Sequence, residues 1–272
     1  MAQATQERWQ TLPVLMYHSV SSVPDGPMRQ FAVPPAVLRE QLTALTGAGY
    51  RLVGLSEALD ALDAGDRSPM VALTFDDGYV DFLEHGVGVL AGAGARATLY
   101  PSVGHLGGSA DWLGAAAPAL GPLMTWSQLA EVADAGVEIG NHGLHHHPMD
   151  VLPAGQLDRE IRDSRDRLAE KLGAPVRSFA YPHGYNSARV RATVARYGHT
   201  NACEVGRRLH SNGSDRFAVS RLQVTPEHRG ADLVELVREG GPQLVPRLKR
   251  AAGPGWRLTR RVALRVFDRR LS

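Results

Sequence analysis

The segment VALTFDDG, residues 71–78, joins an apolar strand pattern to two acidic side chains and decides how the chain is interpreted. Its first five residues are apolar on both faces, which is typical of a strand in a parallel sheet covered by helices. Asp76 and Asp77 follow at the carboxyl end, where α/β folds bind their ligands. Adjacent carboxylates both stay ionised only beside a positive charge, for which a metal ion is the strongest candidate. The alternative is an ordinary turn ending the strand.

Six further apolar strand patterns alternate with helical patterns along the chain. The expected strands cover residues 13–17, 71–75, 97–103, 137–140, 179–181, 202–205 and 218–224. The expected helices cover residues 34–45, 79–90, 125–136, 156–172 and 187–197. A strand followed by a helix, repeated about seven times, predicts an α/β fold with a parallel sheet. Both a closed (β/α) barrel and an open doubly wound sheet fit this order.

The composition is that of an ordinary globular protein. Hydrophobic residues make up 43% and charged residues 21% of the 272 residues, which excludes a largely disordered chain. The single cysteine, Cys203, excludes an internal disulfide framework and a cysteine-based zinc site. We recognise no secretion signal and no apolar run of the roughly 18 residues needed to cross a membrane, so we expect a cytoplasmic location.

The charge is divided unevenly between the body of the chain and its carboxyl-terminal end. Residues 247–272 carry a net charge of +8, which leaves −6 for residues 1–246 and argues against nucleic-acid binding. Within this tail, residues 255–272 place apolar side chains on one arc of a helix and most arginines opposite. This pattern favours peripheral contact with an anionic membrane surface, and a terminal helix packed on the body explains it equally well. A membrane-recruited interaction protein led by the tail is a further hypothesis.

A second cluster of polar side chains follows the strand expected at 137–140. The segment NHGLHHHP, residues 141–148, holds four of the chain's 11 histidines within six positions. His142 and His146 are spaced i, i+4, which places two imidazoles on one side of a helical turn. Imidazole suits zinc, cobalt, nickel and iron, and one added carboxylate completes a set of three ligands. A solvated histidine-rich loop is the alternative.

A third signal is the segment FAYPHG, residues 179–184, again at the end of an expected strand. Its Pro and Gly indicate a turn whose backbone N–H groups could face a ligand, although an ordinary strand-to-helix turn has the same residues. The stretch 104–122, rich in Gly, Ala and Pro, reads as a long loop of the kind that often covers a site. Together, the three signals indicate metal-assisted hydrolysis, with a second carboxylate free to take a proton.

These motifs resemble those of the polysaccharide deacetylase family, also called the NodB-homology domain or carbohydrate esterase family four. TFDDG is similar to its first motif, the stretch 142–146 to its second, and 179–184 to the third motif in the FAYPxG version of one branch. The resemblance implies a single-domain distorted (β/α) barrel of about seven parallel strands. We assign residues 12–246 to this barrel, 1–11 to an N-terminal extension and 247–272 to a basic amphipathic tail.

The resemblance also implies roles for individual residues. Asp77, His142 and His146 would hold a divalent metal ion, with zinc expected first and cobalt, nickel or manganese as alternatives. Asp76 would be the general base that takes a proton from the attacking water. The backbone N–H of His183 would help to stabilise the oxyanion.

The third motif also suggests substrate-binding residues, and the strand expected at 218–224 adds one more. Tyr181 and Pro182 would line the substrate side together with His183. We add Arg221 to this set, because the family's commonest third motif has an arginine where this chain has Ala180. Arg221 could replace that arginine by orienting Asp76, or it could be a surface arginine at a strand start.

Two assignments stay open. The family's late Leu-x-His motif, which supplies a general acid, is not visible here, and the stretch 227–229 lacks the preceding apolar strand. His18 is our first candidate for the acid, and a histidine satisfied by backbone hydrogen bonds is the alternative. Some members space the metal histidines by five, which would select His147. We favour His146 because Met149 then stands where relatives carry Leu.

The sequence therefore predicts a metal-dependent enzyme that removes N-acetyl groups from a sugar or glycoconjugate, releasing acetate and a free amine. A hydrolase of a small non-sugar amide or imide would use the same metal and base. A non-catalytic carbohydrate-binding barrel is the alternative outside the enzymes.

Overall fold

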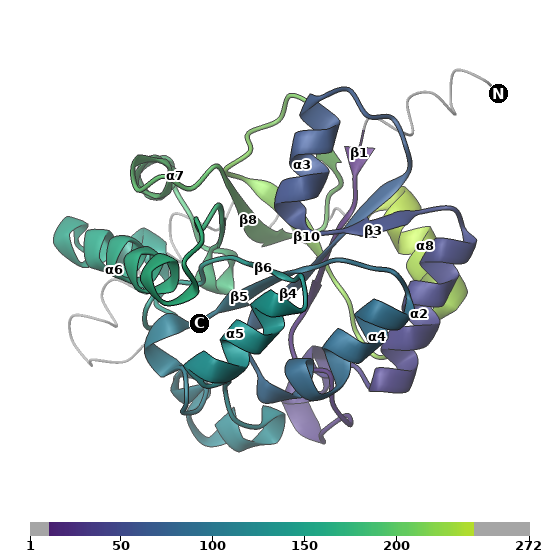
Figure 1. The fold of residues 1–272 in the computed structure, drawn as a ribbon, viewed down its shortest axis with the longest axis horizontal. Helices are drawn as coiled ribbons and strands as arrows, with labels where there is room; N and C mark the ends of the chain where they lie inside the picture. The colour runs from purple at the N-terminus through teal and green to yellow at the C-terminus, as the bar shows by residue number, and fades with distance from the viewer. Residues whose placement is uncertain (1–10, 242–272) are drawn as a thin grey trace.

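The computed structural model describes residues 11–241, and the predictions for residues 1–10 and for the tail at 247–272 lie outside them. A sheet of parallel strands stands at the centre and helices surround it (Figure 1). The strands are β1 (Thr11–Leu12), β2 (Val14–Tyr17), β3 (Arg51–Val53), β4 (Met70–Asp77), β5 (Thr98–Pro101), β6 (Glu138–Ile139), β7 (Ser178–Ala180), β8 (Asn201–Gly206), β9 (His210–Ser211) and β10 (Val219–Gln223).

The α-helices pack around these strands. They are α2 (Pro35–Gly47), α3 (Leu55–Asp63), α4 (Val87–Gly92), α5 (Trp126–Asp134), α6 (Ala154–Leu172), α7 (Ala188–Arg196) and α8 (Gly230–Glu239). Short 3-10 segments are η2 (Gly26–Phe31), η4 (Val103–His105), η5 (Asp111–Leu120), η6 (Met149–Val151) and η7 (Pro182–Gly184), and η3 (Phe82–Gly86) is a π-helical turn. Among the described residues, no helix is both long enough and apolar enough to span a membrane.

Seven strands form a nearly closed barrel in the order β6-β5-β4-β2-β10-β8-β7, and every neighbouring pair is parallel. An isolated parallel bridge between Asn141 and Phe179 joins the end of β6 to β7 and completes the ring. The prediction of a (β/α) barrel of about seven parallel strands is therefore confirmed. Parallel closure brings all seven carboxyl ends to one mouth.

Several elements differ from the expectation. The strand β3, which pairs with the start of β4, and the helices α3 and α8 were not predicted. The helix expected over 79–90 is instead the π turn η3 followed by the short α4. The loop expected over 104–122 contains the 3-10 turns of η5, broken at Gly114, whose φ is positive. The strand β3, the π turn and the 3-10 turns are short or irregular segments, where hydrophobic periodicity carries little information. The helices α3 and α8 are regular and amphipathic, and the sequence analysis missed them.

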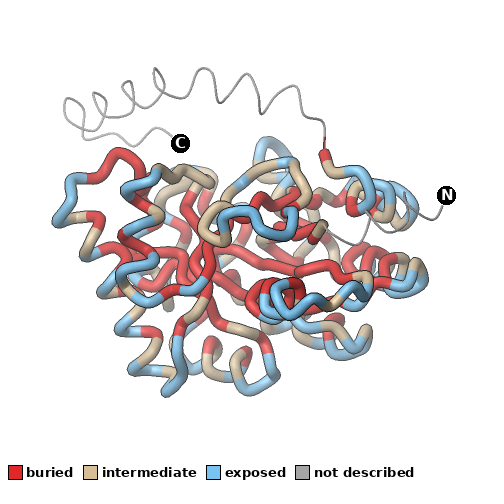
Figure 2. Tube along the Cα trace, turned by 90° about the horizontal axis from the view of Figure 1, so that it is seen from above, coloured by how far each residue is buried: buried red, intermediate tan, exposed pale blue. Residues whose placement is uncertain are grey.

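Side chains alternate between the inside of the barrel and the helices outside it. On β4, Leu73 and Phe75 belong to the large cluster beneath the helices, whereas Ala72 belongs to the smaller cluster inside the barrel. The buried residues therefore run through the middle of the molecule and the exposed residues line its outer turns (Figure 2). Because the strand period is two, Asp76 continues the inward row of Ala72 and Thr74.

Candidate active site

The innermost polar pair at the barrel mouth joins Asp76 to Arg221. On β10, Val219 belongs to the inner cluster, so Arg221, two residues further on, also points inward. Its Nη1 donates to Asp76 Oδ1 at 2.6 Å and its Nη2 to Oδ2 at 2.7 Å. The side chains of Arg221 and Asp76 are 0% and 3% exposed. The pair is thus a buried two-pronged ion pair, of the kind that fixes a carboxylate in one orientation.

The ion pair sets the charge of Asp76. Burial raises the pKa of Asp76, but the charge and hydrogen bonds of Arg221 have the larger, opposite effect. The resulting pKa is about 2, below the ordinary value. The arginine is therefore the positive group that keeps one of the two adjacent carboxylates ionised. Its complete burial overturns the surface-arginine interpretation. The guanidinium faces Asp76, as expected of a residue that orients this carboxylate, and its contact with substrate stays a prediction.

A second group at the mouth consists of Asp77, His142 and His146, all buried. The Nε2 atoms of His142 and His146 lie 3.5 Å and 3.4 Å from Asp77 Oδ1. That oxygen is buried and accepts no hydrogen bond from the described residues. Ligand atoms that surround a metal ion as a tetrahedron, each about 2.1 Å from the ion, lie about 3.4 Å from one another. The two imidazole nitrogens lie at this separation from the carboxylate oxygen.

The electrostatics of this triad also fit a cation. Burial raises the pKa of Asp77 well above its usual range, and the charge of Asp76 raises it further. Burial lowers the pKa of His142 and of His146, so both imidazoles are neutral and can ligate. His142 Nδ1 lies 2.8 Å from the carbonyl oxygen of Ala180 and donates to it, which leaves Nε2 with its lone pair toward Asp77. The residues present therefore fit a divalent metal ion.

The backbone at this site is unusual. The non-glycine residues with positive φ among residues 11–241 are Asp77 (71°), His146 (55°) and His183 (58°), and all three lie at the barrel mouth. Such conformations cost energy and concentrate at functional sites. They also correct one expectation: His142 and His146 do not share a helical turn, because the chain between them is an irregular loop with bends at Leu144 and His145. Their rings nonetheless meet with centroids 4.8 Å apart.

The structure separates the two histidines between which the sequence left a choice. His146 faces Asp77, whereas Nδ1 of His147 lies 2.9 Å from Oε1 of Glu160 on α6. The geometry therefore places His146 in the triad and His147 in a neighbouring cluster.

His18, the candidate general acid, lies directly after β2 beside the ion pair. Burial lowers its pKa to about 4, although the charge of Asp76 opposes this shift. Its ring packs edge-on against Phe31, with centroids 4.9 Å apart. His18 is thus a neutral imidazole near pH 7 in the metal-free chain. In the late stretch 227–229, Nδ1 of His228 accepts a hydrogen bond from the backbone N–H of Thr225.

The turn over 181–184 places some of its residues at the barrel mouth and others beneath the surrounding helices. His183 lies at the mouth, with its ring 4.6 Å from the ring of His146. Tyr181 is fully buried in the cluster beneath α6 and α7, and its hydroxyl donates to the carbonyl oxygen of Phe217. Ala180 points into the barrel, so its neighbour Tyr181 points out toward these helices, and its contact with substrate stays a prediction. Pro182 is also buried, and its contribution is to shape the turn.

Trp112 is a site residue that the motifs did not reveal. It comes from η5, in the stretch expected to be a covering loop, and its ring stacks on His146 at 4.2 Å with an interplanar angle of 17°. His105 packs edge-on against the same tryptophan at 5.0 Å. The only signal in the sequence was a lone aromatic residue in a long Gly- and Ala-rich loop.

We expect Trp112→Ala to weaken zinc binding by about 2- to 12-fold, since aromatic pairs contribute about 0.5–1.5 kcal/mol beyond their buried area. Trp112→Phe, which keeps an aromatic face, should bind zinc nearly as the parent does. Titration of the metal-free protein with zinc in competition with a chromogenic chelator measures both. Equal affinity of the alanine variant and the parent would contradict a role for the stack.

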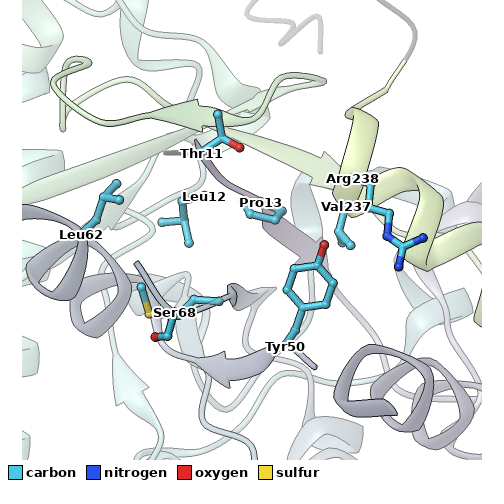
Figure 3. A pocket seen from close by; sticks show the side chains of 9 residues that line it. Thr11, Leu12, Pro13, Tyr50, Leu62, Ser68, Val237 and Arg238 are labelled. Atoms are coloured by element: carbon cyan, nitrogen blue, oxygen red, sulfur yellow. The ribbon is translucent and has the colours of Figure 1, made fainter. Parts of the chain in front are cut away.

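A small pocket lies at the other end of the barrel, and Figure 3 shows its lining. Leu12, Pro13 and Met70 line it at the amino ends of β2 and β4, together with Tyr50 and Val237. It contains none of the candidate site residues. The candidate catalytic and metal-binding side chains lie at the opposite, carboxyl-terminal mouth.

The fold and the residues at this mouth define the class: a (β/α) barrel that gathers two carboxylates and two histidines at its carboxyl-terminal end. The family model for polysaccharide deacetylases matches residues 63–202, just over half of the chain, and the chain belongs to this family. The chain is 27% identical over 227 residues to YxkH of Bacillus subtilis, a protein named as a polysaccharide deacetylase. The match covers 81% of this chain and 74% of that protein.

Solved structures share the fold. The deacetylase PplD of Streptococcus pyogenes, in complex with acetate, has a TM-score of 0.72 at 23% identity, covering 84% of this chain and 98% of its own. IcaB of Ammonifex degensii also has a TM-score of 0.72 at 23% identity, covering 84% of this chain and 97% of its own. These likenesses concern the barrel itself.

Proposed function

We propose that the protein is a metal-dependent deacetylase, which hydrolyses the N-acetyl group of a sugar or glycoconjugate and releases acetate and a free amine. The observation that carries the proposal is the pairing of two groups at one mouth. Asp77, His142 and His146 form a site for a cation, and Asp76 stands beside them as a carboxylate held by Arg221. The family supports an acetylated carbohydrate as the substrate.

Asp77, His142 and His146 would hold the divalent ion, for which zinc fits the small buried triad best. When bound there, the ion would supply Lewis-acid polarisation of the amide carbonyl and would lower the pKa of the attacking water. Asp76, ionised and fixed by Arg221, takes the proton from that water as general base. His183 has a positive φ within the turn over 182–184, which lies at the mouth. The backbone N–H of His183 is our candidate oxyanion donor.

His18 remains our candidate for the group that protonates the leaving amine. The charge of Asp76 acts on this imidazole and favours its protonated form, against the effect of burial. A proton taken up by Asp76 in the first step can therefore reach the leaving nitrogen either directly or through this imidazole. His18→Gln, with Asp76 intact, separates these two routes.

The decisive experiment incubates the zinc-loaded full chain with a panel of acetylated glucosamine substrates, from monosaccharide to oligomer, and measures acetate. We expect acetate release that a strong chelator abolishes and that zinc restores, with cobalt, nickel and manganese compared in parallel. Small amides and imides form the second arm. Ammonia release or ring opening there, without acetate from any acetylated sugar, would show that the non-sugar hydrolase is the correct interpretation. Glycan binding without hydrolysis by the zinc-loaded chain would favour a binding barrel.

A further inference from the structure

A second cluster of histidines and one acid lies directly beside the triad. Glu160, on α6, has a side chain only 3% exposed, and it reaches the loop that carries the consecutive histidines 145, 146 and 147. His145, His147 and Glu160 could together supply three metal-ligating atoms. The distances between these atoms indicate a different role.

Glu160 accepts hydrogen bonds from four donors of the loop. Its Oε2 accepts from the backbone N–H of Leu144 at 3.0 Å and of His145 at 2.9 Å. Its Oε1 lies 2.7 Å from Nδ1 of His145 and 2.9 Å from Nδ1 of His147. These last two separations are hydrogen-bond lengths, shorter than the 3.4–3.5 Å found between ligating atoms around Asp77.

His146 lies between these anchored neighbours and makes no hydrogen bond to Glu160. Its backbone φ is +55°, so the chain turns its side chain to the opposite side from those of His145 and His147. Its Nδ1 is buried and has no hydrogen-bond partner among the described residues. The ring of His146 is thus positioned by its stacking on Trp112 and by the backbone that Glu160 holds.

We infer that Glu160 is the positioning residue that selects His146, out of three consecutive histidines, as the metal ligand. By accepting from Nδ1 of His145 and of His147, it keeps both imidazoles away from the ion. By accepting from two backbone N–H groups, it supports the left-handed turn that points His146 at Asp77. This inference rests on the proposed metal site and adds to it the group that determines the loop's geometry.

We expect Glu160→Ala to weaken zinc affinity by about 10- to 100-fold, the usual effect of removing a group that orients a ligand. Glu160→Gln should restore most of it, because the amide oxygen still accepts the backbone hydrogen bonds and the amide N–H₂ can donate to imidazoles in the other tautomer. Glu170→Ala, an exposed position on the same helix, is the matched control and should leave the affinity unchanged. Chelator competition measures all four proteins, with thermal unfolding in parallel. Equal zinc affinity of Glu160→Ala and the parent would overturn the inference.

A measurement on the unmodified protein covers the case in which Glu160→Ala fails to fold. Long-range ¹H–¹⁵N correlations report the tautomer of each imidazole. We expect His145 and His147 to carry the proton on Nδ1 and to stay unchanged when one equivalent of zinc is added, while His142 and His146 shift. Shifts of His145 and His147 with a second bound equivalent would instead establish a second metal site and overturn the inference. Because neither readout uses a substrate, a protein without acetate release but with these metal results would contradict only the proposed reaction.

Discussion

Asp76→Asn should reduce acetate release by about 10²- to 10⁴-fold, the usual contribution of a general base, while zinc affinity stays close to that of the parent. Asp76 lies outside the triad and its oxygens face Arg221, so an isosteric amide removes the proton acceptor without removing a ligand. Steady-state rates on an acetylated glucosamine oligomer, with zinc content measured on the same samples, provide the test.

The matched variant is Asp77→Asn, one residue further along β4. Asp77 carries the buried oxygen toward which both imidazole nitrogens point, so its loss should abolish zinc binding and activity together. The two neighbouring carboxylates are thus expected to fail in different ways. Full activity of Asp76→Asn, or undiminished zinc binding by Asp77→Asn, would show that the roles have been assigned to the wrong residues.

Arg221→Met should lower the free energy of unfolding by about 3–5 kcal/mol at pH 7, because it leaves Asp76 as an uncompensated charge inside the barrel. The double variant Arg221→Met, Asp76→Asn removes both charges and should recover much of this stability, yet it should stay inactive. Urea unfolding of the four proteins, taken as a double-mutant cycle, measures the coupling. A coupling near zero would contradict the buried ion pair.

The pH dependence of this effect has a defined sign. The pKa of Asp76 in the folded chain is about 2, below its ordinary value of 3.8, so the pair contributes stability that is complete above about pH 4. This contribution is lost as the pH falls through 2. The difference in stability between the parent and Arg221→Met should therefore narrow in acid.

The barrel could be predicted because its strands repeat a strong local pattern. Each of the seven barrel strands lies at or within a few residues of an apolar run recognised in the sequence, and parallel pairing then brings their carboxyl ends together. Asp76, Asp77 and His142 follow such runs directly. Their meeting at one mouth follows from topology alone.

Other features of the site depend on facts that no local pattern contains. The side of the barrel wall that Tyr181 faces depends on the register of β7 against β8, and the partner of Arg221 lies 145 residues earlier in the chain. The role of Glu160 depends on the packing of α6 against a loop. Trp112 approaches His146 through an irregular segment, whose path cannot be derived from periodicity.

The pairing of β2 with both β4 and β10 also bears on how the protein is made. At synthesis rates of about 5–20 residues per second, roughly 7–30 seconds separate the appearance of Asp76 from that of Arg221. Throughout that interval one edge of β2 has no neighbour, and an open edge pairs readily with strands of other chains. The last barrel strand to leave the ribosome is therefore the one that both seals the wall and neutralises the interior, so a chain interrupted before residue 219 is left prone to aggregation as well as inactive.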